Sequence, residues 1–321
     1  MYRTLLNALS PAGREARLSI LIFHRVLPQA DPLFPEEVDA ARFDAQCRWI
    51  REWFRVLPLD EAAMQLREGR LPARALAITF DDGYADNHDV AMPLLQKHGL
   101  TATFFVATGF LDGGRMWNDT VIEAVRRAPA GRLDLAGTVA APLGAFDLGS
   151  DAQRRAAIDA LIRGVKYQEP EERLRWVQAI AERCGVELPN DLMMTSEQVR
   201  GLRRGGMQVG AHTVNHPILA RLPAAQARRE IDDSRRNLQD LLGEPVRVFA
   251  YPNGKPGEDY GDEAVGLVRE LGFETAVSTR WGAAHAGSDP LQLPRFSPWD
   301  RTRSRYAARL AHNLWASRQA A

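Results

Sequence analysis

Short apolar segments alternate with amphipathic segments along most of this chain, and no other feature constrains its fold as much. Strands are predicted at residues 19–24, 75–80, 101–107, 207–211, 246–251 and 275–278. Helices are predicted at 41–54, from 59 onward, and at 90–97, 196–204, 223–242 and 261–271. Strands that alternate with helices pair in parallel, so we expect an α/β fold of the incomplete (β/α) barrel type.

The pattern changes between residues 113 and 191. Gly, Ala and Pro become frequent at 128–149, and two amphipathic helices are predicted at 151–164 and 170–184. This segment does not continue the alternation of strands and helices. We therefore interpret 113–191 as a helical insertion within a single domain that spans residues 1–321.

Charge and cysteine content exclude some classes of function. The 41 Lys and Arg residues balance the 41 Asp and Glu residues, so the basic surplus typical of nucleic-acid-binding proteins is missing and no nucleic-acid partner is expected. Cys47 and Cys184 are far apart and lack CxxC spacing, which indicates neither a disulfide framework nor a thiolate zinc site. We expect both as small buried side chains.

The N-terminal segment gives an expectation for location. The apolar stretch between Arg3 and Arg14 is short and is broken by Asn7 and Pro11, which is poor for a signal peptide. No apolar run approaches membrane-spanning length. We therefore expect a cytoplasmic protein, with a short amphipathic N-terminal anchor on a membrane as the alternative.

Residues capable of chemistry directly follow three predicted strands. They are Asp81 with Asp82, His212 with His216, and the segment 251–254. Reactive groups of parallel barrels come from the C-terminal ends of the strands, so we expect these clusters to converge. Two imidazoles and one carboxylate can hold a metal such as zinc and leave a position for water, while the second carboxylate removes a proton from that water.

Each cluster also has an ordinary structural explanation. Asp-Asp-Gly is common in turns and helix caps, and two histidines four apart before Pro217 are consistent with a capped turn that holds one buried imidazole. Their joint placement at strand ends favours the metal site.

TFDDGYADN at 79–87 and AHTVNHP at 211–217 resemble the first two motifs of the polysaccharide deacetylase family, also called NodB homology or carbohydrate esterase family 4. The resemblance runs from about residue 19 to residue 296, interrupted by 113–191, and implies a distorted (β/α) barrel that performs metal-dependent N-deacetylation. Residue by residue, it assigns Asp81 as general base and Asp82, His212 and His216 as metal ligands. The metal it implies is zinc, with nickel or cobalt as alternatives.

The third family motif, usually RxPY, stands here as AYPN at 250–253. Ala250 replaces its arginine and Asn253 its tyrosine. Arg295 is our candidate to orient the base in place of that arginine. We expect the backbone N–H of Asn253 to help hold the developing oxyanion, with Tyr251 in the same substrate-facing segment.

The family's final Leu-x-His motif, which supplies the general acid, is missing, since LQLPR stands at 291–295. His24, in FHRV at the end of the first predicted strand, is the best replacement for that acid. This arrangement resembles the poly-N-acetylglucosamine deacetylase subgroup, as does FAYP at 249–252. The alternative is a histidine that only packs at the barrel mouth.

Trp117 opens the insertion and is a candidate to line a sugar-binding groove. The alternative is a helix start capped by Asn118 or Asp119 with the indole packed beneath it.

The function we predict is hydrolysis of N-acetyl groups from an N-acetylhexosamine-containing polysaccharide or its lipid-linked precursor, with release of acetate. The chain would then be a hydrolase of non-peptide carbon–nitrogen bonds in exopolysaccharide or surface-glycan synthesis, and a membrane glycan-synthesis complex is a candidate partner. Two alternatives stay open. One is a hydrolase of a small amide at the same metal site, and the other is a catalytically silent glycan-binding or assembly protein.

Overall fold

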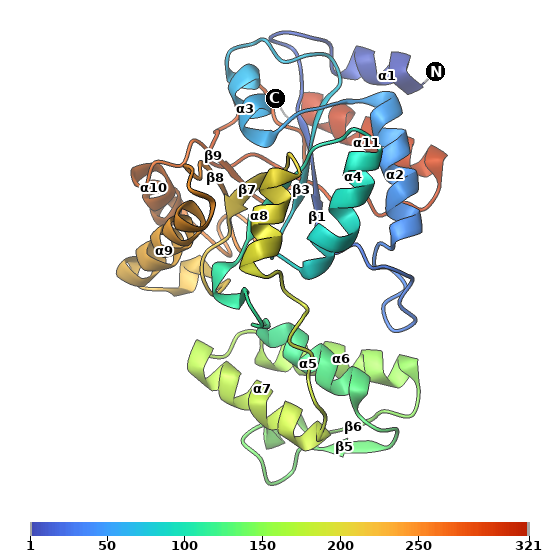
Figure 1. The fold of residues 1–321 in the computed structure, drawn as a ribbon, viewed down its shortest axis with the longest axis vertical. Coiled ribbons are helices and arrows are strands. Elements are labelled where there is room, and N and C mark those ends of the chain that lie inside the picture. The colour runs from blue at the N-terminus through green and yellow to red at the C-terminus, as the bar shows by residue number, and fades with distance from the viewer. Residues whose placement is uncertain (1, 320–321) are drawn as a thin grey trace. The chain divides into compact units, whose positions relative to one another are not determined.

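The computed structural model describes residues 2–319, which form two compact units. We call residues 2–29, 38–112 and 194–319 the barrel unit, and residues 30–37 and 113–193 the insertion unit. The segment predicted as an insertion therefore has a core of its own, joined by a short stretch from the N-terminal part of the chain. Figure 1 shows the helices and strands of both units.

Seven strands form the parallel sheet of the barrel unit: β1 (Ser19–Phe23), β2 (Arg55–Val56), β3 (Ala75–Phe80), β4 (Thr103–Val106), β7 (Gln208–Ala211), β8 (Val248–Ala250) and β9 (Thr275–Val277). Six of them follow one another in the order β1-β3-β4-β7-β8-β9, and β2 pairs with β3 off this path. This topology confirms the predicted α/β fold of the incomplete barrel type.

An irregular segment spans the open side of this barrel. Leu293 forms a parallel bridge with Val277 of β9, and Phe296 forms one with Leu21 of β1. Residues 291–296 therefore run between the first and last strands. Because only isolated pairs hold this segment, it has no strand assignment, and the sequence pattern did not reveal it.

The helices of the barrel unit match most of the predicted segments. They are α1 (Tyr2–Leu9), α2 (Ala40–Trp53), α3 (Leu59–Arg67), α4 (Met92–Lys97), α8 (Ser196–Arg204), α9 (Ala224–Leu242), α10 (Asp262–Glu270) and α11 (Arg303–Gln319), with the short helices η1 (Asn87–Ala91), η2 (Thr108–Phe110) and η4 (Leu219–Arg221). The sequence reading missed α11. No helix among the described residues is both long and apolar enough to cross a membrane.

Strand side chains alternate between the barrel interior and the surrounding helices. Ala75 and Ala77 of β3 pack in one cluster with Ile20, Phe105 and residues of the other strands, whereas Leu76 and Ile78 pack in a second cluster with residues of the helices. Successive side chains of a strand point to opposite faces. Thr79 therefore continues the interior row.

The insertion unit contains α5 (Trp117–Arg127), β5 (Arg132–Asp134), η3 (Ala141–Leu143), β6 (Ala145–Asp147), α6 (Asp151–Val165) and α7 (Pro170–Cys184). The two predicted helices correspond to α6 and α7, and the helix start considered as the alternative at Trp117 corresponds to α5, while the antiparallel β5–β6 pair was not predicted. Val121, Ile158 and Ile180, one from each long helix, are buried in its core. Cys184 is buried in this core and Cys47 in the barrel unit, as expected.

Candidate active site

The interior rows of three strands lead to the candidate residues. Asp81 is two residues beyond the interior Thr79 of β3, and His24 is four residues beyond the interior Ile20 of β1. His212 is two residues beyond Gly210 of β7, where an added Cβ would lie 2.5 Å from the Phe105 ring. Because the C-terminal ends of parallel strands lie at the same end of the barrel, the residues that follow these interior rows lie together at one mouth of the barrel.

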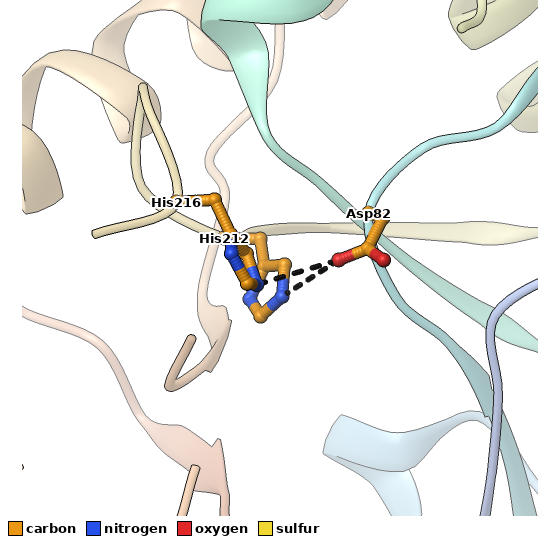
Figure 2. A group of neighbouring side chains, drawn as sticks. All are labelled: Asp82, His212 and His216. Carbon is orange, nitrogen blue, oxygen red and sulfur yellow. Dashed lines mark ion pairs between the residues drawn. The ribbon is translucent and has the colours of Figure 1, made fainter. Parts of the chain in front are cut away.

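Asp82, His212 and His216 form a compact group at this mouth. Asp82 Oδ1 lies 3.4 Å from Nε2 of His212 and 3.4 Å from Nε2 of His216, and both rings face the carboxylate in Figure 2. One ligand atom from each residue lies within 4.8 Å of the others. Two imidazoles and one carboxylate are a donor set that a catalytic zinc uses.

A backbone carbonyl fixes the orientation of His212. Its Nδ1 donates to the carbonyl oxygen of Ala250 at 2.7 Å, and since a carbonyl can only accept, the proton sits on Nδ1. Nε2 is then the ring nitrogen that faces Asp82, at 3.4 Å. Such a bond on the second ring nitrogen is typical of metal-binding histidines.

His216 is positioned by a strained turn. Thr213 and His216 have φ of 62° and 52°, in the left-handed region that non-glycine residues seldom occupy. The N–H of His216 donates to Thr213 Oγ1 at 3.1 Å, and that hydroxyl donates to the carbonyl of His212 at 2.5 Å. The hydroxyl residue between the two histidines therefore bridges their backbones, and the strain is concentrated at the site.

The carboxylate of Glu230 on α9 holds the same turn from outside. It accepts hydrogen bonds from the N–H of Val214 at 3.0 Å and of Asn215 at 2.8 Å, and from the Asn215 side-chain amide at 2.8 Å. Glu230 is only 9% exposed. These bonds fix the loop that carries both histidines, so Glu230 orients the candidate metal ligands.

We expect Glu230→Gln to weaken metal binding by about 10- to 100-fold, the usual cost of losing a partner that orients a ligand. A glutamine has one acceptor oxygen where the turn presents three donors. Metal affinity would be measured by competition with a chromogenic chelator, with Asp233→Asn, an exposed change on the same helix, as the control. Equal affinities for Glu230→Gln and the unchanged protein would contradict the role of Glu230.

The Asp82 carboxylate fits a cation. Its Oδ1 atom is buried and has no hydrogen-bond partner among the described residues, and such an oxygen is costly to bury without one. Burial alone would raise the pKa of Asp82. The interactions with His212 and His216 outweigh this effect, so the pKa lies below its usual value. Burial lowers the pKa of His216 to about 4, which keeps this imidazole neutral, as a metal ligand must be.

Asp81 forms a buried bidentate ion pair with Arg295. The two guanidinium Nη atoms each lie 2.7 Å from a different carboxylate oxygen, and Arg295 is 0% exposed. Arg295 also donates to the carbonyl of Ser278 and to Thr79 Oγ1, both at 3.0 Å. Burial would raise the pKa of Asp81, but Arg295, with His212, lowers it below the usual value. Asp81 is therefore ionised at neutral pH and held in one orientation.

We expect Arg295→Gln to lower the free energy of unfolding by about 3–5 kcal/mol at neutral pH, because it leaves the buried Asp81 charge unpaired. In the unchanged protein the depressed pKa of Asp81 gives stability that is present above its unfolded pKa and is lost as pH falls. Without Arg295, burial raises that pKa, and protonation relieves the unpaired charge. The loss should therefore shrink at about pH 4.

Urea denaturation at the two pH values would measure this effect. Arg247→Gln is the matched control, because Arg247 pairs with Glu274 at an exposed site and should cost about 0–1 kcal/mol. A loss of stability in Arg295→Gln that does not change with pH would rule out the role of the Asp81 charge.

His24 follows β1 with an exposed side chain at the barrel mouth. Its charge adds to the stronger effects that lower the pKa of Asp81, chiefly Arg295, and the pKa of Asp82, chiefly His212 and His216. A histidine buried in the barrel core, one form of the structural alternative, does not fit this exposure.

Two residues of the first motif fix the backbone that carries His24. Asn87 donates through its side-chain amide to the carbonyl of His24 at 2.8 Å. Asp86 accepts from the N–H of Val26 at 3.1 Å and from Nε of Arg25 at 2.8 Å. The segment after β3 therefore holds the segment after β1, although the two are about sixty residues apart in sequence.

The segment that replaces the third motif contributes backbone rather than a tyrosine hydroxyl. Tyr251 is buried, its hydroxyl donates to the carbonyl of Leu291 at 3.0 Å, and its ring stacks on Tyr260 at 3.7 Å. The expectation that Tyr251 faces substrate therefore has no support, because its hydroxyl is used in the core. Asn253 has φ of 57°, and no described residue accepts a hydrogen bond from its N–H.

Trp117 is the first residue of α5 in the insertion unit. Its ring packs partly against the core of that unit, and the guanidinium of Arg173 lies 5.1 Å from the ring centre. Met116 precedes the helix as its N-cap, and no side chain caps it, so neither Asn118 nor Asp119 has the capping role considered above. A sugar-binding role for Trp117 stays a prediction.

Sequence reasoning missed the residues that support the site: Glu230, Asp86 and Asn87. Asp86 and Asn87 lie within the nine-residue motif already singled out, so their polar character beside the buried strand was an available signal. Glu230 carries no such signal, because charged residues are ordinary on the outer face of an amphipathic helix.

Comparison with protein families identifies a matching family. The family described as polysaccharide deacetylase matches residues 68–130 and 174–276, together just over half of the chain, and these ranges include both motifs. YxkH of Bacillus subtilis, whose name places it among the polysaccharide deacetylases, is 21% identical over 289 residues, covering 89% of this chain and 73% of YxkH. A poly-beta-1,6-N-acetyl-D-glucosamine N-deacetylase of Staphylococcus aureus is 32% identical over only 73 residues, 22% of this chain and 25% of its own.

Solved structures show the same fold. The Streptococcus pyogenes deacetylase PplD, determined in complex with acetate, superimposes with a TM-score of 0.60 at 22% identity, covering 88% of this chain and 92% of PplD. IcaB from Ammonifex degensii superimposes with a TM-score of 0.60 at 20% identity, covering 94% and 98%. At these identities the likeness establishes the incomplete barrel and leaves the substrate open.

Proposed function

This chain belongs to the polysaccharide deacetylase family, and on that basis we propose that it hydrolyses N-acetyl groups of an N-acetylhexosamine-containing polysaccharide or its precursor. The reaction consumes one water per acetamide and yields acetate and a free amine on the sugar. One observation carries the proposal. A buried carboxylate oxygen of Asp82, which has no hydrogen-bond partner in the part of the chain that the structure describes, faces two oriented imidazoles. Beside it lies a second carboxylate, Asp81, that is held ionised by Arg295.

Each residue has a distinct role in this proposal. Asp82, His212 and His216 would hold a divalent metal, which we propose is zinc and which supplies Lewis acidity to the acetamide carbonyl and to the attacking water. Asp81 accepts the proton from that water, and Arg295 keeps its carboxylate in place. The N–H of Asn253, which donates to no described residue, would stabilise the developing negative charge on the carbonyl oxygen. His24 protonates the departing amine.

We expect His24→Ala to reduce kcat about a hundredfold while metal content and KM stay close to those of the unchanged protein. The loss is placed at the low end of the range for acid catalysis because His24 is exposed, and water can replace it in part. Steady-state kinetics and metal analysis would measure both quantities. His98→Ala, whose ring pairs with Asp44 at 2.9 Å, is the control. Unchanged kcat, or loss of metal, in His24→Ala would contradict the acid role.

The proposal of a polymeric N-acetylhexosamine rests on the family and on the names of relatives, one of which is a poly-beta-1,6-N-acetyl-D-glucosamine N-deacetylase. Exopolysaccharide synthesis, and a membrane glycan-synthesis complex as partner, would follow from such a substrate.

Acetate release tests the proposal and separates its alternatives. The substrates would be poly-N-acetylglucosamine, chitin oligomers and peptidoglycan fragments, each with and without a chelator, followed by restoration with zinc, nickel or cobalt. We expect chelator-sensitive release from at least one glycan. Release from small amides alone would favour the small-amide hydrolase. Stoichiometric metal with no release from any substrate would favour the silent glycan-binding protein.

A further inference from the structure

A cluster of arginines lies at the end of the barrel opposite the candidate active site. They line a surface pocket of about 380 Å³ between α1, α2 and the start of β3, together with Glu52 and Phe54: Arg3, Arg48, Arg51, Arg55 and Arg74. Arg74 precedes β3 and Asp81 follows it, so the length of the strand separates this pocket from Asp81 by about 20 Å.

Four of these arginines have no carboxylate partner. Arg3, Arg48, Arg51 and Arg55 are exposed, and none forms an ion pair with a described residue. Elsewhere in the barrel unit exposed arginines commonly pair with acids, such as Arg228 with Glu270 at 2.8 Å. Like charges that gather without acids repel one another, so the cluster costs free energy unless an anion joins it.

The one acid in the pocket is already engaged. Both carboxylate oxygens of Glu52 accept from Nη2 of Arg303, at 2.6 and 2.7 Å. Its charge is thereby largely neutralised, and the pocket keeps a surplus of positive charge in a chain whose formal net charge is zero.

Arg74 gives a second, independent indication of a ligand. It is only 8% exposed, its Nη1 donates to the carbonyl of Trp53 at 2.8 Å, and its Nε is buried with no partner among the described residues. Its φ of 58° is a strained value for a non-glycine residue. Burial lowers the pKa of Arg74, and the charges of Arg3 and Arg55 lower it further.

The backbone fixes the geometry of the cluster. The N–H of Arg55 donates to the carbonyl of Arg74 at 2.9 Å, and the N–H of Arg74 donates to the carbonyl of Ser10 at 3.0 Å. The Tyr2 ring packs on Trp53 with centroids 5.2 Å apart, which ties α1 to α2 and holds Arg3 near the others. These arginines are therefore brought together by three separate segments of the fold.

We propose that this arginine pocket binds a phosphate group. Guanidinium groups present paired N–H donors that match phosphate oxygens, and several unpaired ones around a small pocket match a doubly charged oxyanion better than a single carboxylate. The group can belong to a soluble phosphate compound or to a phospholipid headgroup.

Two triple variants test the proposal. The pocket variant is Arg48→Gln/Arg51→Gln/Arg55→Gln, and the control variant is Arg163→Gln/Arg175→Gln/Arg229→Gln, which removes three exposed, unpaired arginines from other helices. Binding of inorganic phosphate and pyrophosphate would be measured by calorimetry, against sodium chloride of equal ionic strength. Sedimentation would measure binding to vesicles of phosphatidylcholine, alone or mixed equally with phosphatidylglycerol.

We expect the pocket variant to bind at least one of these phosphate ligands about tenfold more weakly than the control variant or the unchanged protein. Binding of pyrophosphate alone would identify a soluble phosphate compound. Binding of anionic vesicles that pyrophosphate displaces would identify a headgroup. Equal binding by the two triple variants, or no binding by the unchanged protein, would overturn the proposal. Acetate release from a soluble glycan should be the same in both variants, so this test is independent of the proposed deacetylation.

Discussion

Asp82→Ala, His212→Ala and His216→Ala are each expected to lose the metal and to release no measurable acetate. Each substitution leaves two protein ligands where a catalytic zinc site uses three. Because the loss of an outer partner alone costs about 10- to 100-fold in metal affinity, the loss of a ligand should cost at least about a hundredfold. Metal content after gel filtration, measured by mass spectrometry, and acetate release with added zinc would report both effects.

His88→Ala is the matched control for these variants. His88 follows the first motif on η1, where its ring contacts Asp89 at 2.7 Å, and it is outside the group that could hold a metal. It should keep both metal and activity. Melting temperatures would separate loss of a ligand from loss of the fold. Stoichiometric metal in all three folded ligand variants would refute the assignment of this site.

Asp81→Asn should keep the metal but lose about a thousandfold or more in kcat, because the amide cannot accept the proton from the attacking water. The variant keeps the size of the side chain and one oxygen for Arg295. Arg295, however, is then a buried cation without its counter-charge, so a lower melting temperature is expected as well. Kinetics would therefore be measured well below that temperature.

The comparison between Asp81→Asn and Asp82→Asn decides which carboxylate binds the metal and which acts as the general base. Metal retained in Asp81→Asn and weakened in Asp82→Asn agrees with the roles proposed above. The reverse pattern would exchange them. Full activity of Asp81→Asn would mean that another group takes the proton, and the ion pair with Arg295 would then serve stability alone.

Local sequence was enough to predict six of the seven strands and most helices of the barrel unit. β3 was predicted with its observed ends because a six-residue segment, apolar except for Thr79, stops abruptly at two aspartates and a glycine. α8 was predicted with its observed ends, and the structure shows that Thr195 and Gln198 form a capping box at its start. β2, the β5–β6 pair and α11 were missed, because these strands have only two or three residues each and α11 is weakly amphipathic.

The chemical types of the site residues were also readable from the sequence. Asp81, Asp82, His212 and His216 follow apolar strands, and the rule that parallel strands end together brings them to one mouth. The periodicity of a strand also predicts which of its residues face inward. The sequence therefore determined the fold class and the residues from which a metal site could be built.

Only the tertiary structure decided how these residues are held. Arg295 reaches Asp81 because the irregular segment 291–296 runs between β9 and β1, and isolated bridges of that kind have no sequence period. Glu230 reaches the histidine turn from α9, and Tyr251 turns into the core, and no local sequence pattern indicates either contact. Orientation, burial and partner choice arise from contacts between residues far apart in the chain, whereas local pattern reports only which residues follow a strand or form a helix.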